Sequence, residues 1–158
     1  MKRADLETRV VDDHHQALKL WLRLLSCTNL VEAEVRARLR SEFDTTLPRF
    51  DLMAQLERHG DGLKMNELSQ RLMVTGGNVT GITDQLESEG LVVRESDPAD
   101  RRTYTVKLTP AGRRAFARMA AAHEHWVVGL FSGLAAAEKQ QVYRLLAKLK
   151  VSLEKEKE

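Results

Sequence analysis

The chain has 158 residues, 30% of them charged, yet its formal net charge is only +2. This length suits one domain or one protomer of an intertwined assembly, and the near-neutral charge excludes a histone-like polycation, so any basic surface must be local. The single cysteine excludes an intrachain disulfide and favours a reducing, cytoplasmic setting, while no apolar stretch approaches the roughly 18 residues of a membrane span.

A long first helix is expected over residues 13–40, after a charged N-terminal arm. Asp12 or Asp13 could cap its start. The apolar face is wide for a helix with solvent on most sides, which indicates packing against several elements or against a second chain. Its apolar positions recur at helical spacing: Leu18, Trp21, Leu22, Leu25, Leu30, Val31, Val35 and Leu39.

Residues 41–47 are expected to form a connector. Pro48 then opens a second helix at its first position, with Thr46 or Leu47 near the cap. The His-Gly-Asp-Gly run at 59–62 predicts the turn that ends this helix. Its buried side is predicted to comprise Phe50, Met53, Ala54 and Leu56.

Two short helices follow. The first is expected over residues 66–72, with Leu68 and Leu72 on one face, and it begins after Lys64, which cannot act as an N-cap. The second is expected over residues 75–89, with Thr75 as its N-cap and Gly90 ending it in the usual left-handed position. Its apolar positions at helical spacing are Val79, Ile82 and Leu86.

After residue 90, apolar and polar residues alternate. Residues 91–94 and 103–108 predict two strands, and the polar run at 97–102, Asp-Pro-Ala-Asp-Arg-Arg, predicts the loop that joins them. Asp97, Pro98 and Asp100 suit the chemistry of a tight loop. Helix, turn, helix and β-hairpin is the order of a winged helix-turn-helix.

Two long helices close the chain. Thr109 is expected to cap a helix that starts at Pro110 and runs to about Phe131. The last helix, over residues 136–156, carries a heptad-like apolar seam formed by Val142, Leu146, Leu149 and Leu153. Such a seam favours dimerisation, and the alternative is packing of this helix on the first helix of the same chain.

The stretch from Glu67 to Arg113 resembles the MarR family of bacterial transcription regulators. The most diagnostic part is the wing and its exit, DPADRRTYTVKLTPAG, and the resemblance extends from Trp21 to Leu149. It implies a mainly α fold with a small β-hairpin wing: one protomer over 1–158, a winged helix-turn-helix at 48–109, and dimerisation helices at 13–40 and 110–156. It also implies a homodimer that binds a palindromic operator in double-stranded DNA, and no enzymatic activity.

The second motif helix would enter the major groove by its N-terminal end, where small polar residues let the backbone approach DNA closely. Asn78 could pair with an adenine edge, and Thr80 could meet a phosphate or a thymine methyl. Gly81 costs a helix about 1 kcal/mol relative to alanine, which close approach to DNA or easier helix packing would offset. The predicted DNA-binding residues are Lys64, Thr75, Gly76, Gly77, Asn78, Thr80, Gly81, Arg94, Arg101 and Arg102.

This helix contains Asp84, Glu87 and Glu89 but no lysine or arginine. The cations for phosphate contacts must therefore come from elsewhere. Candidates outside the helix are Lys64, Arg71, Arg94, Arg101, Arg102, Lys107, Arg113 and Arg114. Arg101 and Arg102 resemble the family's wing arginines, which reach the minor groove, while Asp100 is expected to orient an arginine.

Residues 39–58 resemble a branch of the family that senses aromatic acids or their coenzyme A thioesters, especially hydroxycinnamoyl-CoA. Aromatic and soft side chains could line a pocket for a flat acyl group, and arginines could meet a carboxylate or phosphates. The alternative is that the aromatics form core and that Arg49 pairs with Asp51, Asp44 or Glu57. The predicted effector residues are Trp21, Arg36, Arg40, Phe43, Arg49, Phe50, Met53, Phe116 and His123.

The sequence carries no catalytic constellation and predicts no cofactor. Cys27 follows an apolar run and is expected to be a buried small hydrophobe, with a redox-reactive thiol as the alternative. The pairs His14-His15 and His123/His125 cannot chelate a metal within one helix, because their members point to different faces. Alternative functions are a metal-sensing regulator of the same fold, a protein-interaction module with a vestigial winged fold, and an enzyme acting on aromatic thioesters.

Overall fold

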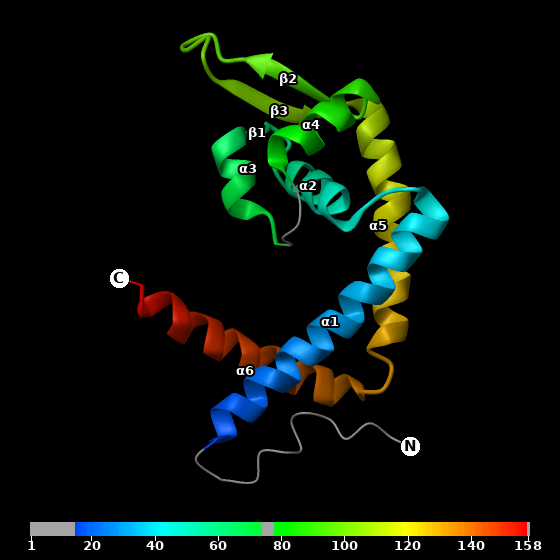
Figure 1. The fold of residues 1–158 in the computed structure, drawn as a ribbon, viewed down its shortest axis with the longest axis vertical. Coiled ribbons are helices and arrows are strands. Elements are labelled where there is room, and N and C mark those ends of the chain that lie inside the picture. The colour runs from blue at the N-terminus through cyan, green and yellow to red at the C-terminus, as the bar shows by residue number, and fades with distance from the viewer. Residues whose placement is uncertain (1–14, 74–77, 158) are drawn as a thin grey trace. The chain divides into compact units, whose positions relative to one another are not determined.

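The computed structural model describes residues 15–73 and 78–157, which form two compact units, one ending at His123 and the other beginning at Glu124 (Figure 1). The boundary lies within one helix. In chain order the elements are α1 (Gln16–Phe43), α2 (Leu47–Arg58), β1 (Leu63–Lys64), α3 (Met65–Arg71), α4 (Val79–Ser88), β2 (Val92–Ser96), β3 (Tyr104–Leu108), α5 (Pro110–Leu130) and α6 (Ala136–Lys155). The expected mainly α winged fold is confirmed.

Helix α1 continues to Phe43, so the prediction that a connector begins at residue 41 is wrong. The helix ends at Asp44, which adopts the left-handed conformation with φ of 48° and donates its N–H to the carbonyl oxygen of Arg40 at 3.2 Å. The helical residues of the predicted connector therefore belong to α1. The predicted N-terminal arm and its caps, Asp12 and Asp13, lie outside the described residues.

Helix α2 begins where Thr46 caps it: the Thr46 hydroxyl accepts a hydrogen bond from the N–H of Arg49 at 3.4 Å. Pro48 occupies the second helical position rather than the predicted first. Phe50, Met53 and Leu56 are buried as expected, while Ala54 is only half-buried. Because eight of its twelve residues are buried, α2 forms the centre of the first unit.

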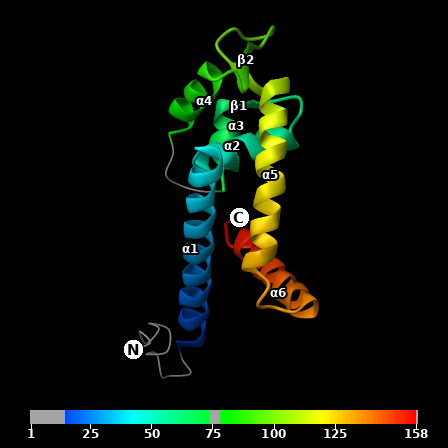
Figure 2. The same cartoon turned by 90° about the vertical axis from the view of Figure 1, so that its right-hand side faces the viewer.

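The wing belongs to a three-stranded antiparallel sheet with the order β1-β3-β2. Arg94 on β2 and Leu63 on β1 both pair with Val106 on the central strand. The two-residue strand β1 was not predicted, because two residues carry no alternation. The turn between β2 and β3 projects away from the helices of the first unit in both views (Figures 1 and 2).

The core of the first unit joins the sheet to four helices. Its most buried side chains come from α1, α2, α3, α4 and β3, and each is at most 2% exposed: Leu39, Leu52, Met53, Leu56, Leu68, Thr83, Leu86 and Val106. Leu68 and Leu86 lie on the apolar faces predicted for the two motif helices. Ile82 is buried too, whereas Val79 and Leu72 are only half-buried. The hydrophobic spacing therefore predicted the inward sides of α3 and α4.

Two tight connections fix the wing to its neighbouring helices. Gly90 ends α4 with a φ of 74°, and the N–H of Leu91 reaches the carbonyl of Leu86 at 2.9 Å. This is the glycine stop that the sequence predicts. The Thr109 hydroxyl accepts from the N–H of Gly112 at 3.0 Å and donates to the carbonyl of Gly90 at 2.6 Å, so Thr109 caps α5 and ties its start to the end of α4.

The second unit contains the end of α5 and all of α6. Helix α6 matches its predicted span to within one residue and contains no buried residue. The four seam residues Val142, Leu146, Leu149 and Leu153 are 38% to 52% exposed. Among the described residues, no helix is both long and apolar enough to cross a membrane.

Candidate nucleic-acid interface

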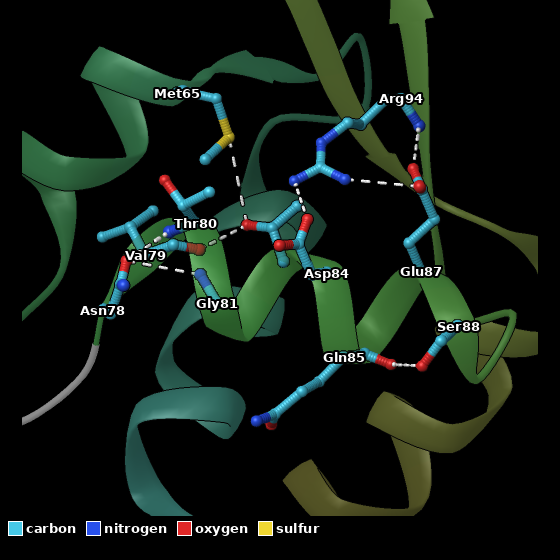
Figure 3. A network of polar contacts seen from close by, with 11 residues as sticks. Met65, Asn78, Val79, Thr80, Gly81, Asp84, Gln85, Glu87, Ser88 and Arg94 are labelled. Carbon is cyan, nitrogen blue, oxygen red and sulfur yellow. Dashed lines mark hydrogen bonds and ion pairs between the residues drawn. The ribbon is translucent and has the colours of Figure 1, made fainter.

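Helix α4 is capped by Asn78, three residues later than predicted. Its side-chain oxygen accepts from the N–H groups of Thr80 at 3.0 Å and Gly81 at 3.3 Å (Figure 3). The prediction that Thr75 caps this helix is wrong, because the helix begins at Val79. Thr75, Gly76 and Gly77, which were also predicted to bind DNA, lie outside the described residues.

Asn78 and Thr80 are both exposed at the start of α4. The carboxamide oxygen of Asn78 already accepts two backbone N–H groups of the helix, so its NH₂ group is the part that could donate to a base. A methyl group built on Gly81 would meet only ordinary contacts, since its three nearest atoms all belong to Asn78 at 3.7 to 3.8 Å. Packing against a neighbouring helix therefore does not explain this glycine.

The guanidinium of Arg94 lies against α4. Its Nη2 donates to Asp84 Oδ1 at 2.5 Å and its Nη1 to Glu87 Oε1 at 3.3 Å, while its backbone N–H donates to Glu87 Oε2 at 3.2 Å (Figure 3). The hydrogen bond to Asp84, aided by the charges of Asp84 and Glu87, raises the pKa of Arg94 above its ordinary value. Arg94 was predicted to contact DNA; in this structure two carboxylates of α4 hold its guanidinium.

The wing loop is fixed by two side-chain turns. The carboxylate of Asp97 accepts from the N–H of Ala99 at 2.9 Å, and that of Asp100 accepts from the N–H of Arg102 at 3.0 Å. Both aspartates thus make the local turn bonds expected of a tight loop. Arg101 and Arg102 are exposed at its tip, and neither forms an ion pair with another of the described residues.

Two other basic residues that are candidates for phosphate contacts lie close to carboxylates of the protein. Lys64 lies 3.9 Å from the carboxylate of Asp97, and Lys107 lies 2.9 Å from that of Glu95 on the neighbouring strand. The Lys64 side chain makes no cap hydrogen bond at the start of α3, and the carboxylate of Glu67 accepts the Lys64 backbone N–H at 3.3 Å. A glutamate three residues after the cap position signals this arrangement in the sequence, although it was not predicted.

A pocket of about 260 Å³ opens in the first unit among α1, α2, α5 and the end of α4. Three predicted effector residues, Phe43, Arg49 and Met53, line it. So does Arg118, which was not predicted because only the fold brings it there. Two acids, Asp44 and Glu89, also line it.

Arg49 connects this pocket to α4. Its guanidinium donates to Gln85 Oε1 at 3.3 Å, to the carboxylate of Glu89 and to the hydroxyl of Thr45 at 3.1 Å. None of the acids that the sequence suggested as partners is among these three. Arg49 also lines a second hollow of about 350 Å³, where Arg36 and Asn78 join it beside the start of α4.

Phe50, Phe116 and His123 are brought together as an aromatic cluster. The ring of Phe50 stacks on Phe116 with centroids 5.4 Å apart and lies 4.8 Å from the ring of His123. Phe50 is buried, Phe116 and His123 are half-buried, and none of the three lines the pocket beside Arg49. Burial lowers the pKa of His123.

The remaining predicted effector residues do not join the pocket. Trp21 is 56% exposed, and Arg40 pairs with Asp44 at 3.3 Å on the surface of α1. Cys27 is exposed in the single chain, so the expectation of a buried small hydrophobe is wrong. Within residues 15–73 and 78–157, no three His, Cys, Asp or Glu side chains form a group that could hold a metal. His14 lies outside this part.

The lowered pKa of His123 predicts a loss of stability in acid. In the unfolded chain the imidazole of His123 takes up a proton near its ordinary pKa of about 6.5, whereas in the folded chain it does so only at lower pH. The folded state is therefore fully stable above that pH and loses stability as the pH falls toward the lower folded pKa. The thermal unfolding midpoint should drop more steeply between roughly pH 7 and pH 5 in the wild type than in His123→Phe. His125→Phe, at an exposed site, is the control, and equal slopes for all three proteins would contradict the prediction.

Comparison with known proteins gives three consistent matches. The MarR family model matches residues 45–104. A crystal structure of a MarR family transcriptional regulator from Silicibacter pomeroyi is similar at 33% identity and a TM-score of 0.78, over 90% of this chain and 99% of that one. The uncharacterized HTH-type transcriptional regulator YkoM of Bacillus subtilis is 36% identical over 85 residues, which cover 54% of this chain and 55% of YkoM.

A further solved structure adds to the likeness in fold. A mutant of MarR from E. coli, crystallised in complex with operator DNA, superposes with a TM-score of 0.73 at 24% identity. The similarity covers 88% of this chain and 99% of that one.

Proposed function

The chain belongs to the MarR family of transcriptional regulators and is not an enzyme, and on this premise we propose that it is a homodimeric repressor of an aromatic-compound catabolic operon. An aromatic acid or an aromatic acyl-CoA such as p-coumaroyl-CoA would release it from a palindromic operator. One observation carries the proposal: Arg101 and Arg102 extend from a wing loop that two aspartate turns hold in place.

The wing and α4 supply complementary contacts. Exposed cations on a fixed loop can approach phosphates or the minor groove with little loss of conformational freedom. The start of α4 offers Thr80, Gly81 and the NH₂ group of Asn78 to the major groove. A glycine that packing does not require supports close approach of DNA at this point. The E. coli relative bound to operator DNA has the same fold.

Exposed apolar residues support the homodimer. Leu18, Trp21 and Leu30 of α1 are 45%, 56% and 71% exposed, and the seam of α6 is exposed as well. Extended apolar surface of this kind commonly marks a protein–protein interface. A dimer would present two copies of α4 to successive major grooves about 34 Å apart.

The pocket beside Arg49 supports an anionic, partly aromatic effector. Phe43 and Met53 provide apolar surface, while Arg49 and Arg118 can meet a carboxylate or phosphates. An anion bound at Arg49 would compete with Glu89 and Gln85, which Arg49 now holds at the end of α4. Such a ligand must bind the released state better by a few kcal/mol in order to shift the population.

Calorimetric titration tests the effector. We expect p-coumaroyl-CoA to bind near one per protomer and to lower the anisotropy of a labelled protein–DNA complex, with the free acid and coenzyme A as controls. Arg118→Gln should weaken this binding about tenfold, because a hydrogen bond to a charged group is removed. Arg114→Gln, an exposed arginine one turn away on α5, is the matched control. Absence of both heat and DNA release with all three compounds would refute the effector class.

A further inference from the structure

The recognition face of α4 carries acids where DNA would lie. Thr80, Asp84 and Glu87 fall at steps of four and three residues, so they share one side of the helix. Asp84 is 59% exposed and Glu87 is 42% exposed at the side chain. Without a partner, these two carboxylates, about one and two turns from Thr80, would repel the phosphate backbone.

Arg94 bridges these two acids from the sheet. It reaches them from β2 with both terminal nitrogens, and its backbone N–H adds a third bond to Glu87 (Figure 3). The arginine side chain is itself only 21% exposed. These two ion pairs use two of the five guanidinium N–H donors and hold the charged group against the acids of α4.

The opposite flank of α4 is held in a similar way. There, Arg49 of α2 binds Gln85 and Glu89. In Figure 3 the side chain of Gln85 points away from the side on which Arg94 meets Asp84. One arginine on each flank therefore holds α4. The helix itself has no lysine or arginine, and the cations that pair with its acids come from β2 and α2.

Given the proposed DNA-binding function, on which this depends, we propose that Arg94 is a positioning residue. It acts on DNA recognition through Asp84 and Glu87, by neutralising them and by holding α4 against the sheet, and it does not touch DNA. Both carboxylates remain exposed, and ion pairs with exposed carboxylates contribute little to folding stability. Loss of Arg94 should consequently affect DNA affinity far more than the stability of the fold.

A mutant cycle separates this role from a phosphate contact. Arg94→Gln is made in the wild type and in the Asp84→Asn/Glu87→Gln background. Each full-length protein is titrated, at several salt concentrations, against a duplex that the wild type enriches from a random-sequence pool. Thermal unfolding of each variant is followed in parallel.

We expect Arg94→Gln to weaken DNA binding about tenfold in the wild-type background and less than about twofold in the neutralised background. The effects should differ because Arg94 acts through Asp84 and Glu87, and coupled residues are not additive. In the neutralised background the salt dependence should also stay unchanged, because no freed acid is left there to repel phosphate. Equal weakening in both backgrounds, with the salt slope reduced by about 0.9 for each phosphate that is no longer neutralised, would instead identify a phosphate contact and overturn the proposal.

Arg94→Lys provides a second variant for the same cycle, and it replaces Arg94→Gln should the latter fail to fold. Lysine binds phosphate as a point charge but cannot form the two-pronged bridge to both acids. A weakened Arg94→Lys protein supports the positioning role, and wild-type affinity would contradict it. Failure of the wild type to enrich or bind any duplex would refute the proposed function itself. That result differs from equal weakening in both backgrounds, which would refute only the positioning role of Arg94.

Discussion

Replacing both wing arginines, Arg101→Ala and Arg102→Ala, should weaken DNA binding by at least about 100-fold, because each charge-assisted hydrogen bond contributes roughly 1.5–3 kcal/mol. The slope of log affinity against log salt should also fall, by about 0.9 for every phosphate that the variant no longer neutralises. Both side chains are exposed and form no ion pair with the other described residues, so their removal leaves no buried charge behind. Helix content and dimerisation should be unchanged.

Fluorescence anisotropy with a labelled duplex measures this effect, with circular dichroism and sedimentation to confirm the intact dimer. Lys155→Ala/Lys157→Ala is the matched control, since it removes the same two charges from the end of the chain. Near-wild-type DNA affinity of the wing variant would contradict the proposal that Arg101 and Arg102 contact DNA. It would also favour the alternative of a protein-interaction module, which the acidic residues Asp84, Glu87 and Glu89 would suit.

Replacing Gly112 by alanine should destabilise the first unit by about 3 kcal/mol, the upper range for a forced overlap in a packed site. An added methyl group would overlap the carbonyl oxygen of Leu91 and lie 3.3 Å from the Leu108 side chain. The backbone that joins α4 to β2 would have to move away from α5. Because Thr109 ties the same two segments together, the wing would lose its fixed position relative to α4.

Urea unfolding measures the change in the free energy of unfolding. Gly129→Ala in the same helix is the control, because nothing lies within 4 Å of the added methyl. Alanine there should stabilise the helix by up to about 1 kcal/mol. Equal effects of the two substitutions would contradict the close approach at Gly112.

Features decided by neighbouring residues could be predicted from the sequence. Gly90 ends α4 and Thr109 caps α5 as expected, because each acts on backbone groups one to three residues away. The apolar spacing likewise identified the buried faces of α3 and α4. The start of α4 was misplaced because Thr75 and Asn78 are both good caps, and local preference alone does not choose between them.

Features decided by contacts across the fold could not be predicted. Arg94 meets Asp84 ten residues away, and Arg49 meets Glu89 forty residues away. Both were assigned to outside ligands because the sequence gives a charge but not its partner. Phe50 and Phe116 were assigned to a ligand pocket for the same reason, although their spacing serves a core cluster equally well.

Selection of duplexes from a random-sequence pool by the full-length protein, followed by footprinting, tests the central claim most directly. A DNA-binding homodimer predicts enrichment of an inverted repeat whose half-sites lie about one helical turn, ~34 Å, apart. Protection should cover both major grooves and the flanking minor grooves, and the minor-groove protection should vanish in the wing variant. Failure to enrich any sequence, or enrichment of a single half-site, would contradict the account of a dimer that reads DNA with α4 and the wing.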